Sequence, residues 1–403
     1  MRIGMVLDKI FPADERVEYE AQSLAKAGHR VTIFSYSGSN TSSQEDLGYA
    51  KVFRLPINKF FARKFKQISP NVSVFSWLWY KPLSQALRSN PVDALHAHDL
   101  YMVPVCLYLR KRMSVKIPIV ADLHENYPAA LDIYNFANTF PGNILIAKSA
   151  WKKKELEWLN NTEKIITVIE ESKKYYTQRG VQPQKIHIVP NFVNISQFYQ
   201  SEDTLEDIEK TPRLPQGGTN LLYIGAINHH RGLQEVIEAL THPELKDHDI
   251  KFWIVGDGSY LHRLKKMTTN LNLNNVYFFG RKSHKELPFL IHRSDICLIP
   301  HIKSLHTDTT IPHKLTQYMV YKKPIFASNC TPIQRIIGEI GCGSIFESGN
   351  ILNLTQQLST LLSRKNDWLE MGERAYHAVQ EKYNWQISED NLTETYKAIS
   401  IYE

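Results

Sequence analysis

Short apolar runs alternate with amphipathic segments along almost the whole chain, and this alternation predicts the fold class. Residues 2–8 form a near-continuous apolar run of the kind that is buried in a parallel sheet. In the segment that follows, Val17, Ala21 and Leu24 share one helical face, and Gly28 is well suited to end the helix. Further strand-like runs lie at residues 31–35, 92–97, 117–121, 165–169 and 186–189. Strands and helices that alternate in this way indicate a doubly wound α/β domain.

A polar break over residues 200–219 separates this series from a second one. The break contains acidic residues followed by prolines and glycines: Glu202, Asp203, Glu206, Asp207, Glu209, Pro212, Pro215, Gly217 and Gly218. The second series has strand-like runs at residues 221–224, 252–255, 276–279, 296–299, 325–327 and 344–346. We predict two Rossmann-like α/β domains, residues 1–194 and 195–380, facing each other across a cleft that binds the ligands. Residues 381–403 are predicted to form a C-terminal helix that packs back on the first domain.

The composition favours a soluble globular protein with anionic partners. Of the 403 residues, 43% are hydrophobic and 22% are charged, which is typical of neither a disordered nor a fibrous protein. No apolar run approaches the roughly 20 residues that cross a bilayer, and the first residues resemble a strand rather than a signal peptide. Four scattered cysteines without metal-ligand spacing favour a reducing compartment, so we expect a cytoplasmic protein. The net charge of +7 favours nucleic acid, a membrane surface or phosphorylated small molecules as partners.

Basic residues follow several predicted strands of the second domain. Gly225 ends the first of these strands, and Arg231 lies where the next helix opens, so that backbone amides and a guanidinium together form an anion site. Arg281 and Lys282 follow a later strand and point to the same edge of the sheet. Each residue alone has a simpler interpretation as a solvated charge, and we interpret Asp257 as the cap of a helix. Cations at successive strand ends favour an anionic ligand.

The segment from residue 311 to residue 324 carries the largest number of candidate ligand contacts. Pro312 is well placed to begin a helix whose buried face includes Leu315 and Met319. Lys314 and Gln317 then lie three residues apart on a neighbouring face, where both can meet one ligand. The Gln317 amide both donates and accepts hydrogen bonds, which suits a ribose diol. The alternative is an ordinary amphipathic helix with its polar residues in water.

In the first domain, two predicted strands end in histidines and carboxylates, at residues 96–99 and 122–125. A zinc site is conceivable from these residue types. However, His96 and His98 are expected on one face of the sheet, separated from His124 by another element, so structural or capping roles are favoured for these two residues and no metal is expected. His124 is expected at a strand end that faces the cleft, and it is the stronger functional candidate.

Residues 51–83 are rich in basic and aromatic side chains, which has two interpretations. These side chains are Lys59, Phe60, Phe61, Arg63, Lys64, Phe65, Lys66, Trp77, Trp79, Tyr80 and Lys81. The segment either lies on an anionic membrane and meets a lipid-linked acceptor, or is an acceptor-side loop and helix that packs on the first domain. No nucleic-acid-binding module is recognisable, so we expect no nucleic-acid partner.

Taken in order, these motifs resemble glycosyltransferase family 4, the retaining group 1 type, and its relatives with the GT-B fold. The matching segments are residues 14–17, 28–31, 96–99, 122–125, 189–191, 223–225, 231–232, 255–258, 314–319 and 323–324. The resemblance implies transfer with retention of anomeric configuration and no metal or other cofactor. It also implies that the second domain binds most of a nucleotide-sugar donor, with a UDP- or GDP-sugar favoured.

Individual positions of the family pattern carry over to this chain. Arg231 matches the phosphate-binding lysine, His124 the histidine that contacts the transferred sugar, and Gln317 the second of two paired glutamates that hold the ribose. Three positions depart from the pattern. Ala226 stands where the family usually has arginine, Thr309 replaces the first glutamate, and residues 8–12 replace a double glycine. The neighbouring Asp308 is a candidate substitute for the missing carboxylate at Thr309.

The resulting hypothesis is a hexosyltransferase-like enzyme that moves a sugar to a hydroxyl of a glycan or lipid-linked acceptor, in the biosynthesis of surface polysaccharide or glycoconjugates. It would be cytoplasmic or peripheral on the inner face of the membrane. The candidate catalytic residues are His124, Arg231 and Lys314. The candidate donor-binding residues are Gly225, Arg231, Arg281, Thr309, Thr310, Ile311, Pro312, Lys314 and Gln317. The acceptor-side candidates are Asp14, Arg16, Asp99, His124 and Glu125. The alternatives are a non-catalytic glycosyltransferase-like or sugar-binding partner and a nucleotide-sugar epimerase.

Overall fold

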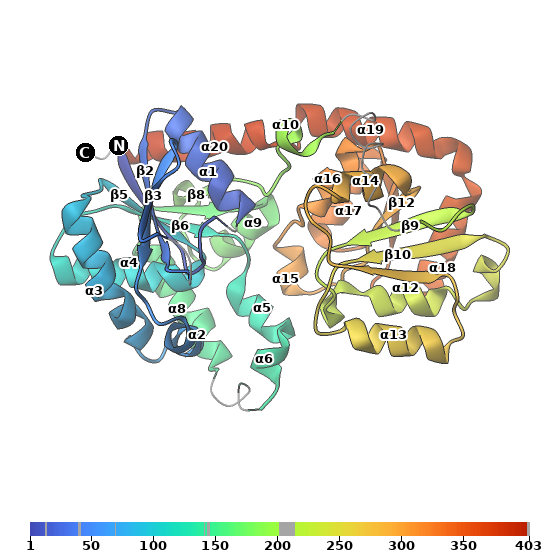
Figure 1. Cartoon of the computed structure of the whole chain (residues 1–403), viewed down its shortest axis with the longest axis horizontal. Coiled ribbons are helices and arrows are strands. Elements are labelled where there is room, and N and C mark those ends of the chain that lie inside the picture. Colours follow the sequence, from blue (N-terminus) through green and yellow to red (C-terminus); the bar gives the residue numbers. More distant parts are fainter. Residues whose placement is uncertain are drawn as a thin grey trace. The chain divides into compact units, whose positions relative to one another are not determined.

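The computed structural model describes residues 1–12, 14–38, 42–68, 70–140, 142, 146–200 and 214–400 (Figure 1). The chain divides into two compact units, the first made of residues 1–191 and 386–403 and the second of residues 192–385. The predicted boundary after residue 194 lies close to the first division, and the chain returns to the first unit a few residues later than predicted. The acidic part of the predicted connection and its first proline lie in residues 201–213, outside the described residues.

The first unit is built on an eight-stranded sheet in the order β3-β4-β2-β1-β5-β6-β7-β8. The strands are β1 (Arg2–Val6), β2 (Arg30–Tyr36), β3 (Gln44–Asp46), β4 (Ala50–Leu55), β5 (Ala94–His98), β6 (Ile119–Leu123), β7 (Lys164–Thr167) and β8 (Ile186–Ile188). All neighbours pair in parallel except β3, which pairs antiparallel with β4. The sequence interpretation missed β3 and β4, because the polar β3 is wholly exposed and β4 mixes Lys51 and Arg54 with its apolar residues.

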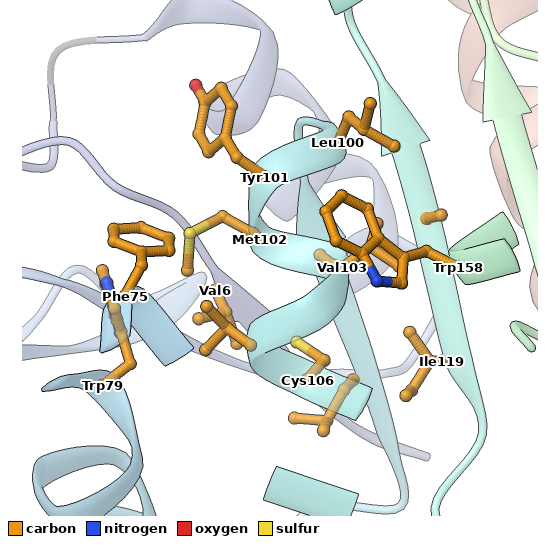
Figure 2. Packing of buried hydrophobic residues seen from close by; sticks show 14 of the residues in the cluster. Val6, Phe75, Trp79, Leu100, Tyr101, Met102, Val103, Cys106, Ile119 and Trp158 are labelled. Carbon is orange, nitrogen blue, oxygen red and sulfur yellow. The ribbon is translucent and has the colours of Figure 1, made fainter. Parts of the chain in front are cut away.

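Helices cover both faces of this sheet and enclose two buried clusters. They are α1 (Glu15–Lys26), α2 (Lys59–Gln67), α3 (Val74–Ser89), η1 (Leu100–Met102), α4 (Val103–Met113), α5 (Tyr127–Ile133), α6 (Asn135–Asn138), α8 (Lys148–Asn160), α9 (Glu170–Gln178), η2 (Pro183–Lys185) and α20 (Trp385–Ser400). Figure 2 shows one cluster, in which Met102 and Cys106 lie opposite Phe75 and Trp79 of α3. The other cluster packs α1 and Tyr396 of α20 against the opposite face of the sheet.

The C-terminal helix α20 is joined to the first unit by polar contacts as well as by packing. Ser388 Oγ donates a hydrogen bond to the carbonyl of Pro190 (2.9 Å), and Asn391 Nδ2 donates to that of Ile188 (2.9 Å). Tyr396 is fully buried. Among the described residues, no helix has the length and apolar composition needed to cross a membrane.

The second unit has a six-stranded, all-parallel sheet in the order β11-β10-β9-β12-β13-β14. Its strands are β9 (Thr219–Ile224), β10 (Ile250–Val255), β11 (Val276–Gly280), β12 (Ile296–Ile299), β13 (Ile325–Ser328) and β14 (Gly343–Phe346), all of which were predicted. Its helices are α10 (Ile195–Phe198), η3 (His229–Arg231), α12 (Leu233–Ala239), η4 (Pro243–Leu245), α13 (Leu261–Asn270), α14 (Leu287–Arg293), α15 (Leu305–Asp308), α16 (Lys314–Val320), α17 (Thr331–Ile340), α18 (Ile351–Ser363), η5 (Lys365–Asp367) and α19 (Trp368–Glu381).

Both units therefore have the predicted doubly wound α/β architecture, and each has a point at which the strand order reverses. In the first unit β1 lies between β2 and β5, and in the second β9 lies between β10 and β12. Connections leave such a point toward opposite faces of the sheet, which opens a crevice beyond the carboxyl ends of the strands. The residues that follow β1, β5, β6 and β9 are thus placed to form sites.

Candidate functional site

The turn after β9 in the second unit brings a glycine and a lysine ammonium together. Gly225 has a φ of 138°, and a Cβ at this position would lie 2.8 Å from Lys314 Nζ. Glycine adopts such a φ without strain, and its missing side chain leaves the space that the ammonium occupies. Lys314 is the first residue of α16, so the predicted start of this helix near Pro312 is confirmed.

The Lys314 ammonium is buried and has no hydrogen-bond partner among the described residues. Nζ lies 3.8 Å from the centroid of the Tyr223 ring, which attracts a cation but does not replace its hydrogen bonds. Burial lowers the pKa of Lys314 well below its ordinary value, and the nearby charge of Arg231 lowers it further. A buried amine that lacks acceptors is costly, and an anionic ligand would supply them.

Arg231 contributes the second cation of this site from the end of η3. Its Nη1 lies 3.1 Å from Nε2 of His301, while its Nε is buried without a hydrogen-bond partner in the described part of the chain. Burial, followed by the charge of Arg231, lowers the pKa of His301 well below its ordinary value and that of His230 to about 3. Both imidazoles are therefore neutral near pH 7, and the neutral His301 accepts the guanidinium hydrogen bond. The positive charge of the site comes from Arg231, and from Lys314 whenever it is protonated.

Glycines in the neighbouring loops allow their backbones to approach closely. A Cβ on Gly256 would lie 1.9 Å from the carbonyl oxygen of Gly225, and one on Gly258 would lie 2.3 Å from that of Ile227. In this tight loop Asp257 accepts a hydrogen bond from the amide of Gly258 (2.7 Å), and α13 begins only at Leu261. The interpretation of Asp257 as a helix cap is therefore wrong.

Several of the other predicted donor residues have partners of their own or follow another strand. Thr309 Oγ1 donates to the carbonyl of Leu305 (2.7 Å) and Thr310 Oγ1 to that of His306 (2.8 Å), so both hydroxyls satisfy the end of α15. Ile311 is buried, and Pro312 and Gln317 are partly exposed. Arg281 is exposed after β11, an edge strand two positions from β9.

The predicted substitute for the missing carboxylate, Asp308, already has partners. Its Oδ1 accepts hydrogen bonds from Lys303 Nζ (2.9 Å) and from the amide (2.7 Å) and hydroxyl (2.9 Å) of Thr331. Asp308 therefore joins α15 to α17.

The site of the first unit is centred on Asp122, which lies near the end of β6 and is fully buried. Arg16 Nη2 donates to Asp122 Oδ1 (2.9 Å), and Oδ2 lies 2.7 Å from His124 Nε2 and 3.2 Å from His98 Nδ1. Burial alone would raise the pKa of Asp122, but Arg16 and His124 hold it well below its ordinary value. The carboxylate thus carries a full negative charge in the protein interior.

The same network keeps His124 protonated. Burial alone would lower its pKa, but the carboxylates of Asp122 and Asp99 outweigh burial and raise the pKa to about 9. His124 Nδ1 lies 3.7 Å from Asp99 Oδ1, and the side chain is 14% exposed. Asp99 is held by the hydroxyl of Tyr101 (2.6 Å) and has a φ of 69°, a strained value for a residue other than glycine. His124 is therefore a partly exposed cation that is held between two carboxylates.

The expected separation of His96 and His98 from His124 is wrong, because β5 and β6 are neighbouring strands. His98 Nδ1 lies 3.3 Å from His124 Nε2, and the rings of His96 and His98 are stacked 4.3 Å apart.

Sequence reasoning also missed two members of the network. Glu20 Oε1 lies 2.8 Å from Arg16 Nη2, and the pKa of Glu20 is raised to about 8, mainly by burial. Tyr396 OH lies 2.8 Å from His96 Nδ1. The spacing of Arg16 and Glu20, four apart on an otherwise apolar helix face, was the available signal.

Glu20, His96, His98 and Asp122 offer ligand atoms within 4.8 Å of one another, which is close enough for a metal ion. The arrangement fits a metal poorly. The imidazole planes differ by only 13° and are stacked, so their in-plane lone pairs do not converge on one point. The Arg16 guanidinium also contacts both carboxylates, at 2.8 and 2.9 Å. The cluster is better described as a hydrogen-bonded network that positions His124.

The remaining acceptor-side candidates differ in their distance from His124. Asp14 is paired with Lys9 (2.5 Å); burial would raise its pKa, but the charges of His124 and Lys9 lower it. Arg16 is 2% exposed, so it lies beneath the site and acts through Asp122. Glu125 accepts a hydrogen bond from Tyr134 OH (2.6 Å). Asp99 therefore faces His124, the charge of His124 acts on Asp14, and Arg16 supports His124 through Asp122.

Two family models match the chain, one on each half. A model described as glycosyltransferase family 4 matches residues 14–197, and a model described as glycosyl transferases group 1 matches residues 205–378. The alpha-monoglucosyldiacylglycerol synthase of Streptococcus pneumoniae is 22% identical over 86% of this chain and 75% of its own length. The putative colanic acid biosynthesis glycosyl transferase WcaI of Escherichia coli is 30% identical over 41% of this chain and 40% of its own.

Solved structures share the fold over the whole chain. Sucrose-phosphate synthase from Thermosynechococcus elongatus superimposes with a TM-score of 0.81 at 15% identity, covering all of both chains. Anabaena HepE in complex with UDP-glucose gives a TM-score of 0.68 at 14% identity, covering 99% of this chain and all of the other. At sequence identities this low, the structural similarity shows only that these proteins and this chain share the GT-B fold.

Proposed function

The chain belongs to the group 1 glycosyltransferases and has their GT-B fold, and from this we propose that it transfers a hexose from a nucleotide sugar to a hydroxyl of a glycolipid or polysaccharide acceptor. We further propose that the transfer retains the anomeric configuration and needs no metal ion. The names of the Streptococcus and Escherichia relatives support a lipid or polysaccharide acceptor, and the HepE complex supports a UDP-sugar donor.

The observation that carries this proposal is the pair of buried cations after β9. Lys314 Nζ and Arg231 Nε are both buried without hydrogen-bond partners among the described residues. A nucleoside diphosphate has several charged oxygens that can accept from both groups, and its charge would favour the protonated form of Lys314. Gly225 leaves the space in which the ammonium can meet such a ligand.

The same two cations would promote the chemical step. As the bond between the anomeric carbon and the phosphate oxygen breaks, negative charge develops on the diphosphate, where Arg231 and Lys314 can stabilise it. The acceptor oxygen forms the new bond to the anomeric carbon on the face that the diphosphate leaves, and its proton passes to a phosphate oxygen. No protein base is required. The protonated His124 would donate a hydrogen bond to a hydroxyl of the transferred sugar and orient it.

A thermal-shift panel of UDP-, GDP- and ADP-sugars without added metal tests the donor site. We expect one nucleotide family to raise the melting temperature of the wild-type chain and to have no such effect on the Arg231→Ala variant. Arg263→Ala on α13 is a matched control, because it removes an exposed arginine from the same unit. An equal shift in wild type and Arg231→Ala would show that the phosphate assignment is wrong.

A second candidate function is a non-catalytic partner that retains nucleotide binding. Thr309 and Gln317 replace the paired glutamates, and the Thr309 hydroxyl is committed to the carbonyl of Leu305. Turnover separates the two functions. Release of nucleoside diphosphate in the presence of acceptor supports the transferase, whereas a thermal shift without release under any acceptor supports the partner.

A further inference from the structure

We propose that α2 is an interfacial anchor that docks the first unit on an anionic lipid bilayer beside the acceptor-side residues. This proposal rests on the glycosyltransferase function and specifies where its acceptor is met. In the structure, the two interpretations of residues 51–83 apply to different helices. Trp79 of α3 is fully buried in the core, as expected for a packed helix, whereas α2 has a different burial pattern.

The helix α2 buries very little of its own surface. Ala62 is its one buried residue, while Phe60 is 63% exposed and Phe61 is 49% exposed. The helix is nonetheless well formed, because Asn58 caps it by accepting hydrogen bonds from the amides of Phe60 (3.1 Å) and Phe61 (3.3 Å). Two adjacent phenylalanines that are this exposed form an apolar patch, which is unusual for a helix of a soluble domain. In the boundary layer of a bilayer the same side chains would be favourably buried.

The charge of α2 complements an anionic surface. Residues 59–67 contain Lys59, Arg63, Lys64 and Lys66 and no acidic residue. Lys66 is paired with Asp8, but Lys59, Arg63 and Lys64 form no ion pair within the described residues. Lys64 Nζ instead lies 4.3 Å from the centroid of the Phe60 ring. Exposed aromatics and unpaired cations on one short helix are the combination that binds the headgroup region of an anionic membrane.

The last turn of α2 connects this surface to the acceptor-side edge of the sheet. Lys66 Nζ lies 2.7 Å from Asp8 Oδ2, just beyond β1, and 4.0 Å from the centroid of the Tyr101 ring. Tyr101 donates to Asp99, whose other carboxylate oxygen faces His124. A chain of direct contacts therefore runs from α2 to His124. A bilayer that binds α2 would bring a lipid-linked hydroxyl near this edge.

Co-sedimentation of the full chain with vesicles tests the proposal. We expect binding to vesicles of phosphatidylglycerol and phosphatidylcholine in equal parts, weak binding to pure phosphatidylcholine, and a loss of binding as salt rises. The triple variant Lys59→Gln, Arg63→Gln, Lys64→Gln should bind anionic vesicles at least about tenfold more weakly. The double variant Phe60→Ser, Phe61→Ser should also lose most of its binding. All five side chains are exposed or half exposed, so these changes should leave the fold intact.

Matched controls come from the second unit. The triple variant Arg263→Gln, Lys265→Gln, Lys266→Gln on α13 removes the same charge from another exposed helix, and Leu369→Ser removes an exposed apolar side chain from α19. Neither should reduce vesicle binding by more than about twofold. The proposal is overturned if wild type does not bind anionic vesicles or if the α13 triple variant loses as much binding as the α2 triple variant. Full binding by the Phe60→Ser, Phe61→Ser variant would also overturn it, because the contact would then be that of a soluble polyanion.

The nucleotide panel keeps this proposal separate from the proposed function. The α2 variants should retain the full thermal shift with the donor nucleotide, because α2 and the Arg231–Lys314 pair belong to different units. Loss of vesicle binding with an unchanged nucleotide shift supports the anchor. Vesicle binding that survives in the α2 variants refutes the anchor and leaves the donor site untouched.

Discussion

Each unit carries a charged cluster near the carboxyl ends of its strands, yet the clusters differ in how their charges are balanced. In the first unit Asp122 is surrounded by Arg16, His98 and His124, so each charge has a partner inside the protein. In the second unit Arg231 and Lys314 face neutral histidines and an aromatic ring. The charges of Arg16, Asp122 and His124 are balanced inside the first unit, whereas the second cluster has no anion among the described residues. From this difference we expect the first cluster to orient a ligand and the second to attract one.

The largest effect is expected from breaking the balance of the first cluster. Asp122→Asn removes the negative charge that neutralises Arg16, which is buried, and His124, which is mostly buried. Removing one partner of a buried ion pair typically costs about 3–5 kcal/mol. Asp93→Asn is the control, because its pair with Arg2 lies at the surface and should cost less than about 1 kcal/mol. Urea unfolding of both variants measures the difference, and equal losses would show that the cluster does not depend on internal pairing.

Substitutions in the second cluster should lower the rate of turnover rather than the stability of the fold. Arg231→Ala and Lys314→Ala each remove a cation that lacks a charged partner in the described structure, so the apo chain should lose little stability. Removal of one group that stabilises a developing charge typically slows turnover about 10²–10³-fold. Rates of nucleoside diphosphate release, compared with urea unfolding of the same variants, test this. A variant that unfolds easily and turns over normally would reverse the assigned roles of the two clusters.

The pH dependence of stability offers a third comparison, because the protein raises the pKa of His124 and lowers that of Lys314. The pKa of His124 is raised to about 9 in the folded chain, against an ordinary value near 6.5. Its contribution to stability is therefore fully present below about pH 6.5 and is lost as pH rises through about 9, and it amounts to at most about 3 kcal/mol.

Glu20 titrates in the same range, since its pKa is raised to about 8. The measurement is therefore made in a Glu20→Gln background, by comparing the unfolding free energy with and without His124→Gln between pH 6 and pH 10, a range chosen to bracket about 6.5 and about 9. The two curves should converge toward high pH. Parallel curves would mean that His124 is neutral in the folded protein.

The sequence predicted the architecture better than it predicted the sites. Buried parallel strands are near-continuous apolar runs, so the strands of the second sheet and most of the first were identified. The strand β3 was missed because it is a polar edge strand, and β4 was missed because Lys51 and Arg54 interrupt its apolar pattern. The sequence pattern correctly placed Arg231 after β9, Lys314 at the start of a helix and His124 at the end of β6. The pairing of Glu20 with Arg16 could have been predicted from their spacing, but the approach of Glu20 and Tyr396 to His96 could not, because it depends on how α1 and α20 pack on the sheet. The hydrogen bond from the Thr309 hydroxyl to the carbonyl of Leu305 was likewise not predictable, because it depends on the local course of α15.

The smallest effect is expected from Gly225→Ala, which tests whether space around the second cluster matters as much as its charge. The new Cβ would lie 2.8 Å from Lys314 Nζ at a φ of 138°, but the lysine end is flexible and can move aside. We expect a loss of about 1–3 kcal/mol of stability from backbone strain, and roughly tenfold weaker nucleotide binding because the ammonium is displaced. Calorimetric titration of nucleotide into the variant and into the wild-type chain measures the loss of affinity.

Gly338→Ala in α17 is the matched glycine control, because no atom lies within 4 Å of its added Cβ and its φ is not in the strained range. Alanine is favoured over glycine inside a helix by about 0.5–1 kcal/mol, so this variant should be neutral or slightly more stable and should bind nucleotide normally. If Gly225→Ala binds as well as Gly338→Ala, the ammonium does not touch the ligand, and Arg231 alone must attract it. The second cluster would then contain one ligand-binding cation, with Lys314 a buried neutral amine that packs on Tyr223.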